Sequence, residues 1–104
     1  MNIDTITAEL RFFLDKEGRL KQYPSRQRQK MAALCYLASK FTPDVKYTEA
    51  EVNELLRQWH TFEDWAMLRR ELYDKWFLGR EANGSLYWLE ETTPGMTDSA
   101  RNQA

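Results

Sequence analysis

The sequence predicts a mainly α-helical domain that ends in a small β-hairpin, which places it in the α+β class. Four stretches carry apolar residues three or four positions apart, the spacing of a helix with one buried face. Residues 48–51 read Thr-Glu-Ala-Glu, the pattern of a capping box that begins a helix. Asn83 and Gly84 lie between two runs with β-propensity, which is a strong signal for a hairpin.

The composition indicates a folded domain rather than a disordered chain. Hydrophobic residues make up 42% and aromatic residues 13% of the 104 residues, and the formal net charge is −1. No apolar run approaches the roughly 18–20 residues of a membrane span, and the first residues lack the pattern of a secretory leader. A single cysteine cannot form an internal disulfide, which fits a reducing compartment. We therefore expect a cytoplasmic protein with no membrane partner.

A first helix is predicted over 4–14, with Asn2 or Asp4 available as its N-cap. Gly18 is expected to end this helix, because glycine readily takes the left-handed conformation. The stretch 19–24 is expected to be extended, because its proline disfavours helical angles at the preceding residue. The apolar stripe of the helix consists of Ile6, Leu10, Phe13 and Leu14.

A second helix is predicted over 26–41, with Ser25 as its N-cap. A short extended piece at 45–47 is expected to add a third strand beside the hairpin. The residues of the second helix that are expected to face the core are Met31, Leu34, Cys35, Ala38 and Phe41.

Two further helices are predicted over 49–59 and 62–76, joined by a short turn. The capping box starts the first of them, and Thr61 with Asp64 three residues later is expected to start the second. We expect most of the larger aromatic residues in the core, because each buries a large area: Trp59, Trp65, Trp76, Trp88, Tyr36, Tyr73 and Tyr87. The expected buried residues are Val52, Leu55, Leu56 and Trp59, then Phe62 at the entry of the fourth helix, and Trp65, Leu68, Leu72 and Trp76 along it.

The hairpin is predicted over 77–90, with strands at 77–82 and 85–90 on either side of the Asn-Gly turn. Residues 1–90 are expected to form a single domain. The stretch 91–104 holds mostly Thr, Pro, Gly, Ser, Asn and Gln, so it is expected to be a flexible C-terminal tail.

This order of elements is that of a winged helix-turn-helix domain with an extra N-terminal helix. The three core helices would be 26–41, 49–59 and 62–76, and 77–90 would be the wing. In such a fold the helix after the turn enters the DNA major groove, and the wing contacts the backbone or the minor groove. The connectivity therefore predicts that helix 62–76 and the hairpin form the surface that faces DNA.

Several blocks of the sequence resemble a bacterial domain family of unknown function. They are residues 13–20, Tyr23-Pro24, 47–53, 68–72 and 84–88. The resemblance extends over 12–89 and implies a winged-helix-like domain that occurs alone or attached to helix-turn-helix transcriptional regulators and acetyltransferases. It implies an association with transcriptional regulation and supplies neither catalytic residues nor a ligand. The family usually has a glycine at the end of the fourth helix, where this chain has Trp76.

Basic groups are concentrated in the first half of the chain. Residues 1–47 hold nine of the fifteen basic groups but only five of the sixteen acidic groups. On helix 62–76, Arg69 and Arg70 carry guanidinium groups of the kind that contact guanine edges or phosphates. The other cations contribute to DNA binding if they lie on the same face of the protein as Arg69 and Arg70. The residues hypothesised to bind double-stranded DNA are Arg69, Arg70, Arg80, Arg19, Lys21, Arg26, Arg28 and Lys30.

Other interpretations stay open. Helix 62–76 has four acidic groups against three basic ones, so its arginines can instead pair within the helix, for example Arg70 with Asp74. This balance and the sequence pI near 5.8 favour a protein-interaction or homodimerisation module on the same scaffold, without DNA contact. A further alternative is a small-anion or nucleotide site around Arg19, Lys21, Arg26 and Arg28.

The sequence predicts no enzyme activity, no cofactor and no metal site. His60 stands alone near a helix end, and Cys35 lies on an apolar helix face, where it is expected to pack as a small hydrophobic residue. One histidine and one cysteine cannot build a zinc site without several carboxylates, and no glycine-rich phosphate loop is present.

Overall fold

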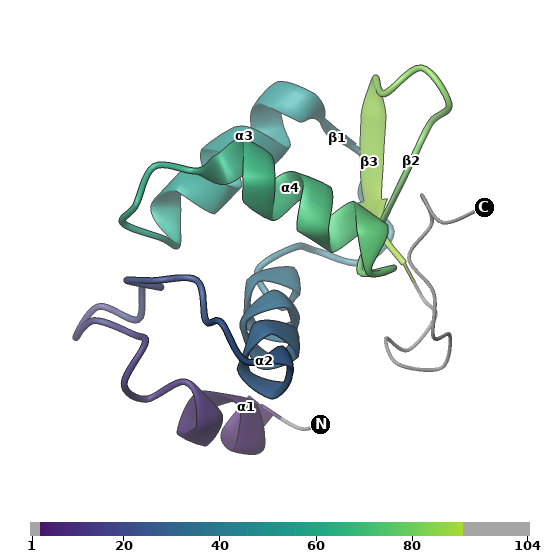
Figure 1. Ribbon diagram of the computed structural model, residues 1–104. Coiled ribbons are helices and arrows are strands. Elements are labelled where there is room, and N and C mark those ends of the chain that lie inside the picture. The colour runs from purple at the N-terminus through teal and green to yellow at the C-terminus, as the bar shows by residue number, and fades with distance from the viewer. Residues whose placement is uncertain (1–2, 91–104) are drawn as a thin grey trace.

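The computed structural model describes residues 3–90, which form four helices and one small sheet (Figure 1). This arrangement confirms the predicted α+β class. The tail predicted at 91–104 and the possible N-cap Asn2 lie outside the described residues. Within 3–90, none of the helices has the length and apolar character that a membrane crossing needs. The elements are α1 (Ile3–Glu9), α2 (Gln27–Ala38), β1 (Tyr47–Thr48), α3 (Glu49–Gln58), α4 (Trp65–Asp74), β2 (Leu78–Arg80) and β3 (Leu86–Leu89).

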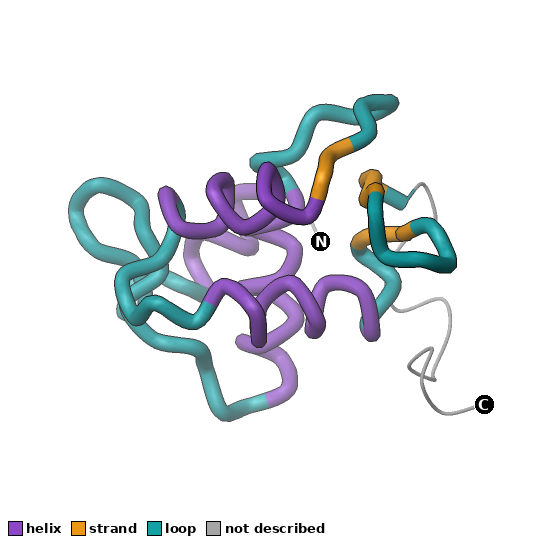
Figure 2. The backbone as a smooth tube through the Cα atoms, turned by 90° about the horizontal axis from the view of Figure 1, so that it is seen from above, coloured by secondary structure: helices purple, strands orange, loops and turns teal. Residues whose placement is uncertain are grey.

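The helices pack around a leucine-rich core. The sheet lies at one end of the helices (Figures 1 and 2). Helix α1 packs against α2, and α3 packs against α4. The strands form an antiparallel sheet in the order β1-β3-β2. The short third strand predicted at 45–47 is therefore present, but it starts two residues later and ends one residue later than expected. The fully buried leucines are Leu10, Leu20, Leu34, Leu37, Leu56, Leu68, Leu72 and Leu78.

The first helix is shorter than predicted, because α1 ends at Glu9 and not at residue 14. After a turn, Leu14 forms an antiparallel β-bridge with Leu20, which the helical spacing did not predict. Gly18 has a φ of +83°, so its left-handed conformation is confirmed, but it turns the loop between these two leucines and does not end α1.

The segment after this loop contacts the turn between α3 and α4. The N–H of Leu20 donates to the carbonyl of Trp59 at 2.8 Å, and the N–H of Thr61 donates to the carbonyl of Leu20 at 2.9 Å. These bonds form a parallel β-bridge between Leu20 and His60. Leu20 is thereby fixed to the turn between α3 and α4.

The predicted start and end of the second helix are wrong. Its N-cap is Arg26, which makes no side-chain cap hydrogen bond, because α2 begins one residue too late for Ser25 to cap it. The helix also ends at Ala38 rather than at residue 41. Of the five residues expected to face the core, Leu34, Ala38 and Phe41 are buried, whereas Met31 and Cys35 are half-buried.

The capping box of α3 is confirmed. The N–H of Glu51 donates to Oγ1 of Thr48 at 3.1 Å, and the N–H of Thr48 donates to Oε1 of Glu51 at 2.8 Å. Both bonds satisfy backbone donors that the helix itself leaves unpaired. The predicted buried residues Val52 and Leu56 are buried, and Leu55 is half-buried.

Replacing Thr48 with alanine is expected to lower the free energy of unfolding by about 1 kcal/mol, because the cap acceptor is lost. Urea denaturation followed by far-UV circular dichroism measures this change. Thr61→Ala is the matched control, since Thr61 is exposed and caps no helix, and its effect should stay within about 0.5 kcal/mol. Equal effects of the two substitutions would contradict the capping role.

Helix α4 is shorter than the predicted 62–76, and its N-cap is Asp64 rather than Thr61. Oδ1 of Asp64 accepts from the N–H of Met67 at 3.3 Å. On either side of the helix, Glu63 and Trp76 have left-handed backbone, with φ of +51° and +71°. Non-glycine residues rarely adopt this conformation. The residue types at these two positions therefore gave no signal for the ends of α4, and the spacing of apolar residues predicted a longer helix.

Of the seven aromatic residues expected in the core, Tyr36 and Tyr87 are buried in it, whereas the four tryptophans are only half-buried. Trp59 and Trp65 are half-buried and pack against the core with one side, while Trp76 and Trp88 are half-buried near the sheet. All four lie at or near the ends of helices or on the sheet, where a large ring covers the core without being enclosed by it.

The hairpin is confirmed, but its turn is longer than a two-residue Asn-Gly turn. Arg80 pairs with Tyr87, and the N–H of Glu81 donates to the carbonyl of Leu86 at 2.9 Å. Gly84 alone of the two turn residues has a positive φ, +74°, and its N–H donates to the carbonyl of Glu81 at 2.9 Å. A two-residue type I′ turn needs positive φ at both positions, so the loop takes a longer form.

Candidate nucleic-acid interface

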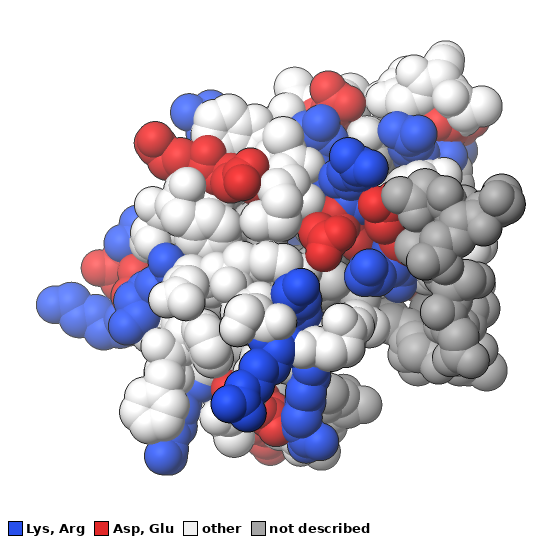
Figure 3. All heavy atoms as spheres, in the orientation of Figure 1, with Lys and Arg blue, Asp and Glu red and all other residues white. Residues whose placement is uncertain are grey.

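Three of the predicted DNA-binding arginines meet in one hollow between α4 and the hairpin. Arg69 and Arg70 come from α4 and Arg80 from the end of β2, and the hollow has a volume of about 370 Å³. Figure 3 shows acidic and basic groups side by side where α4 meets the hairpin. The other lining residues are Glu49, Tyr73, Asp74 and Tyr87. We call this surface the arginine hollow.

Arg69 is the most enclosed of the three, with 19% of its side chain exposed. Its Nη1 donates to Oδ1 of Asn53, and its Nε lies 3.8 Å from Oε1 of Glu49. The partners come from α3, so Arg69 does not pair within its own helix. These contacts hold the guanidinium group in one position at the edge of the hollow.

Arg70 forms the pair within the helix that the spacing predicts. Its Nε lies 3.4 Å from Oδ2 of Asp74, four residues later. The arginine side chain is 74% exposed, so this pair contributes little to stability, on the order of 0.3–0.5 kcal/mol.

Arg80 is held by two tyrosines. Its guanidinium carbon lies 4.5 Å from the centre of the Tyr73 ring, and hydrogen bonds with Tyr87 and Tyr73 raise the pKa of Arg80. The hydroxyl of Tyr87 also donates to Oε1 of Glu49 at 3.4 Å, so that Glu49 links Arg69 to the hairpin. The arginine hollow therefore combines three cations with the carboxylates of Glu49 and Asp74.

The structure does not bring the cations of the first half into the arginine hollow. Arg19 pairs with Asp15 and Glu17 at 3.1 and 2.9 Å, and Arg28 pairs with Glu9. Hydrogen bonds from the backbone N–H groups of Arg19 and Glu17 lower the pKa of Asp15. The remaining three do not line the hollow either: Lys21, Arg26 and Lys30.

The residues that hold these arginines in place were not predictable from the sequence. Tyr73 and Tyr87 were expected in the core, and Tyr87 is buried there while its hydroxyl also contacts Arg80. The one available signal was helical spacing, which puts Tyr73 four residues after Arg69. The approach of Tyr87 to Arg80 depends on the strand register, which the length of the turn sets.

His60 has a structural role in the turn. The ring is buried, its Nδ1 lies 2.6 Å from the carbonyl oxygen of Leu56, and its Nε2 accepts from the N–H of Asp64 at 2.9 Å. The neutral ring with its proton on Nδ1 satisfies both bonds. Burial raises the pKa of the half-buried Cys35 thiol. In residues 3–90, no three His, Cys, Asp or Glu side chains are grouped so that they could hold a metal ion.

A scan against protein families gives the family of this chain. Residues 19–89 match the model described as "Uncharacterized protein conserved in bacteria (DUF2087)". The chain belongs to the DUF2087 family. The DUF2087 match runs from the loop before α2 to the end of β3 and includes every residue of the arginine hollow. Searches of curated proteins and of solved structures found no match.

Proposed function

We propose that this chain is a winged-helix-like, transcription-related domain that contacts double-stranded DNA through α4 and the β2–β3 hairpin. The order α2, β1, α3, α4 and hairpin supports the proposal, because winged helix-turn-helix domains have the same order. Helix α4 would then be the helix that enters the major groove, and the hairpin would be the wing. A role of this kind belongs in the cytoplasm, where an unpaired cysteine is stable.

The observation that carries this proposal is the arginine hollow. Arg69 and Arg80 are held by side chains of α3, α4 and the hairpin, so little conformational entropy is lost when they bind an anion. Guanidinium groups match the geometry of phosphate oxygens. A phosphate of the DNA backbone is therefore a suitable ligand for this surface.

The two carboxylates of the hollow limit the affinity. A phosphate must compete with Glu49 for Arg69 and with Asp74 for Arg70. Because phosphate contacts release counterions, we expect weak binding that falls steeply as the salt concentration rises.

Fluorescence anisotropy with a labelled DNA duplex at several salt concentrations tests the proposal. Arg69→Gln and Arg80→Gln should each weaken binding to all duplex sequences and reduce the slope of log K against log salt by about 1. Arg28→Gln is the control, because Arg28 lies outside the arginine hollow. Absence of binding at low salt, or equal losses in the control, would refute DNA contact through this surface.

One observation favours the second candidate function, a protein-interaction or homodimerisation module. Glu63 and Asp64 are exposed at the start of α4, the end of a reading helix that contacts base edges in helix-turn-helix domains. Acidic groups there repel DNA phosphates but suit a basic protein surface. Sedimentation velocity over a range of concentrations tests for a homodimer, and a strict monomer would contradict homodimerisation.

A further inference from the structure

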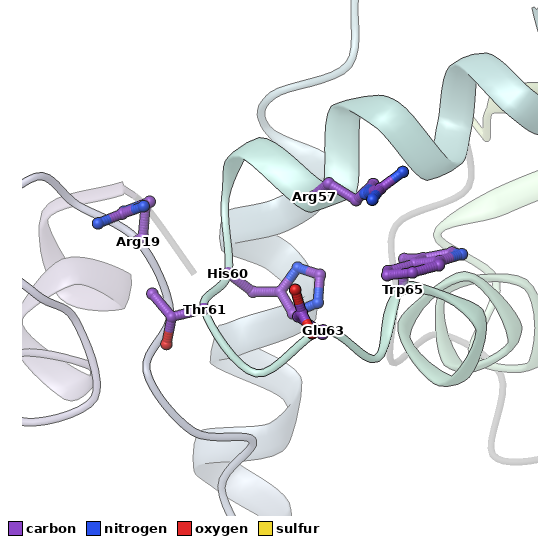
Figure 4. A pocket seen from close by; sticks show the side chains of 6 residues that line it. All are labelled: Arg19, Arg57, His60, Thr61, Glu63 and Trp65. Atoms are coloured by element: carbon purple, nitrogen blue, oxygen red, sulfur yellow. The ribbon is translucent and has the colours of Figure 1, made fainter.

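A second hollow lies at the turn between α3 and α4 (Figure 4). Its volume is about 310 Å³, at the lower end of the range of about 300–1,000 Å³ that is typical of small-molecule sites. Four segments form it: the loop before α2, the end of α3, the turn, and the start of α4. Its lining residues are Arg19, Arg57, His60, Thr61, Glu63 and Trp65. We call it the turn hollow.

The frame of the turn hollow is held by buried hydrogen bonds. Leu20 fixes the backbone of Trp59 and Thr61 from one side, and the ring of His60 fixes Leu56 and Asp64 from the other. A site with a fixed frame loses little entropy when it binds a ligand.

Arg57 supplies a cation that is almost free for a ligand. Its guanidinium carbon lies 4.5 Å from the centre of the Trp65 ring, and its one ion pair in the described part of the chain, with Glu54, is long at 4.0 Å. Arg19 differs, because Asp15 and Glu17 already neutralise it. Figure 4 shows Arg57 and Trp65 on one side of the hollow, with Arg19 and Thr61 on the other.

Glu63 supplies the opposite charge. The residue is exposed, and no hydrogen bond or ion pair joins its carboxylate to the rest of residues 3–90. Its φ of +51° places it in the left-handed region, which sets where its side chain lies relative to the turn. Arg57 and Glu63 line the same hollow, yet no ion pair within 4.0 Å joins them.

We propose that the turn hollow binds a small zwitterion, namely a free α-amino acid with an apolar or aromatic side chain. The carboxylate of the ligand pairs with Arg57, its ammonium group pairs with Glu63, and its side chain packs against Trp65. A simple anion would meet the carboxylate of Glu63, and a simple cation would meet the guanidinium group of Arg57. Only a ligand with both charges satisfies both residues. This proposal does not depend on DNA binding.

Titration of the full ¹⁵N-labelled chain with L-phenylalanine, followed by NMR, tests the proposal. We expect saturable shifts at the indole N–H of Trp65 and the amide of Thr61. The two halves of the ligand, 3-phenylpropionate and 2-phenylethylamine, carry one charge each and should bind at least 10-fold more weakly. No saturable shift at millimolar L-phenylalanine, equal binding of either half, or shifts confined to the arginine hollow would overturn the proposal.

Substitutions test the contributions of the Arg57 and Glu63 charges to binding one at a time. Arg57→Gln and Glu63→Gln should each weaken the binding of L-phenylalanine at least 10-fold, and Arg57→Lys should restore part of it. Both residues are exposed, and an unchanged spectrum outside the turn shows that each variant folds. Glu81→Gln and Arg28→Gln are matched controls outside the hollow and should bind like the original chain. Unchanged affinity in Arg57→Gln or Glu63→Gln would also overturn the proposal.

Discussion

Replacing Leu20 with alanine is expected to lower the free energy of unfolding by about 2–5 kcal/mol, the largest effect that we predict. The side chain is fully buried, and the backbone of Leu20 is bonded on both sides to the α3–α4 turn. The segment cannot move inward to fill the space without breaking these bonds, so a cavity stays behind. Urea denaturation measures the loss.

Ile3→Ala serves as the control for this substitution. Ile3 is also a large aliphatic residue, but it is 50% exposed, and its replacement should change the free energy of unfolding by about 0.5 kcal/mol or less. Hydrogen exchange at the amide of Thr61 adds a local measurement, since this group donates to Leu20. Similar losses in both variants would show that Leu20 does not anchor the turn.

Replacing Gly79 with alanine is expected to destabilise the protein by about 1–3 kcal/mol, because the hairpin has no room for a side chain there. A Cβ atom at this position would contact Nε1 of Trp88 and would lie 2.6 Å from Cε2 of the same ring. The indole is held in place by its N–H, which donates to Oε1 of Glu90 at 2.9 Å. The ring must therefore move and lose this bond.

A double-mutant cycle isolates the steric cause. If the indole is the obstacle, Gly79→Ala should lower the free energy of unfolding much less in a chain that already carries Trp88→Ala. The expected coupling energy is on the order of 1 kcal/mol. Thermal or urea unfolding of the four chains gives this quantity. Strictly additive effects would mean that the cost at position 79 does not come from the Trp88 ring.

The parts of the fold that were predictable from the sequence are set by neighbouring residues. The capping box at Thr48 and Glu51 is complete within four residues, and Gly84 turns the hairpin locally. The ends of α4 were not predictable, because Glu63 and Trp76 adopt a conformation that their residue types disfavour. The bridge from Leu20 to His60 joins residues forty positions apart and leaves no periodic pattern in the sequence.

The contacts in the candidate sites were likewise predictable only where both residues are close in the sequence. The contact of Arg70 with Asp74 follows from helical spacing alone. The contacts of Arg69 with α3 and of Arg80 with Tyr73 depend on how the helices and the hairpin pack together, which a single sequence does not reveal. The turn hollow was not predicted at all, because Arg57, Glu63 and Trp65 become neighbours only once the turn has formed.

The left-handed backbone of Trp76, at the joint between α4 and β2, has a consequence for recognition. A glycine at this joint would move easily between positive and negative φ, whereas a tryptophan cannot. The angle between helix and hairpin therefore has less freedom than a glycine at this joint would allow. A duplex that touches both must bend or adjust its groove width to that angle, so easily deformed base steps would be preferred even where no side chain reaches a base.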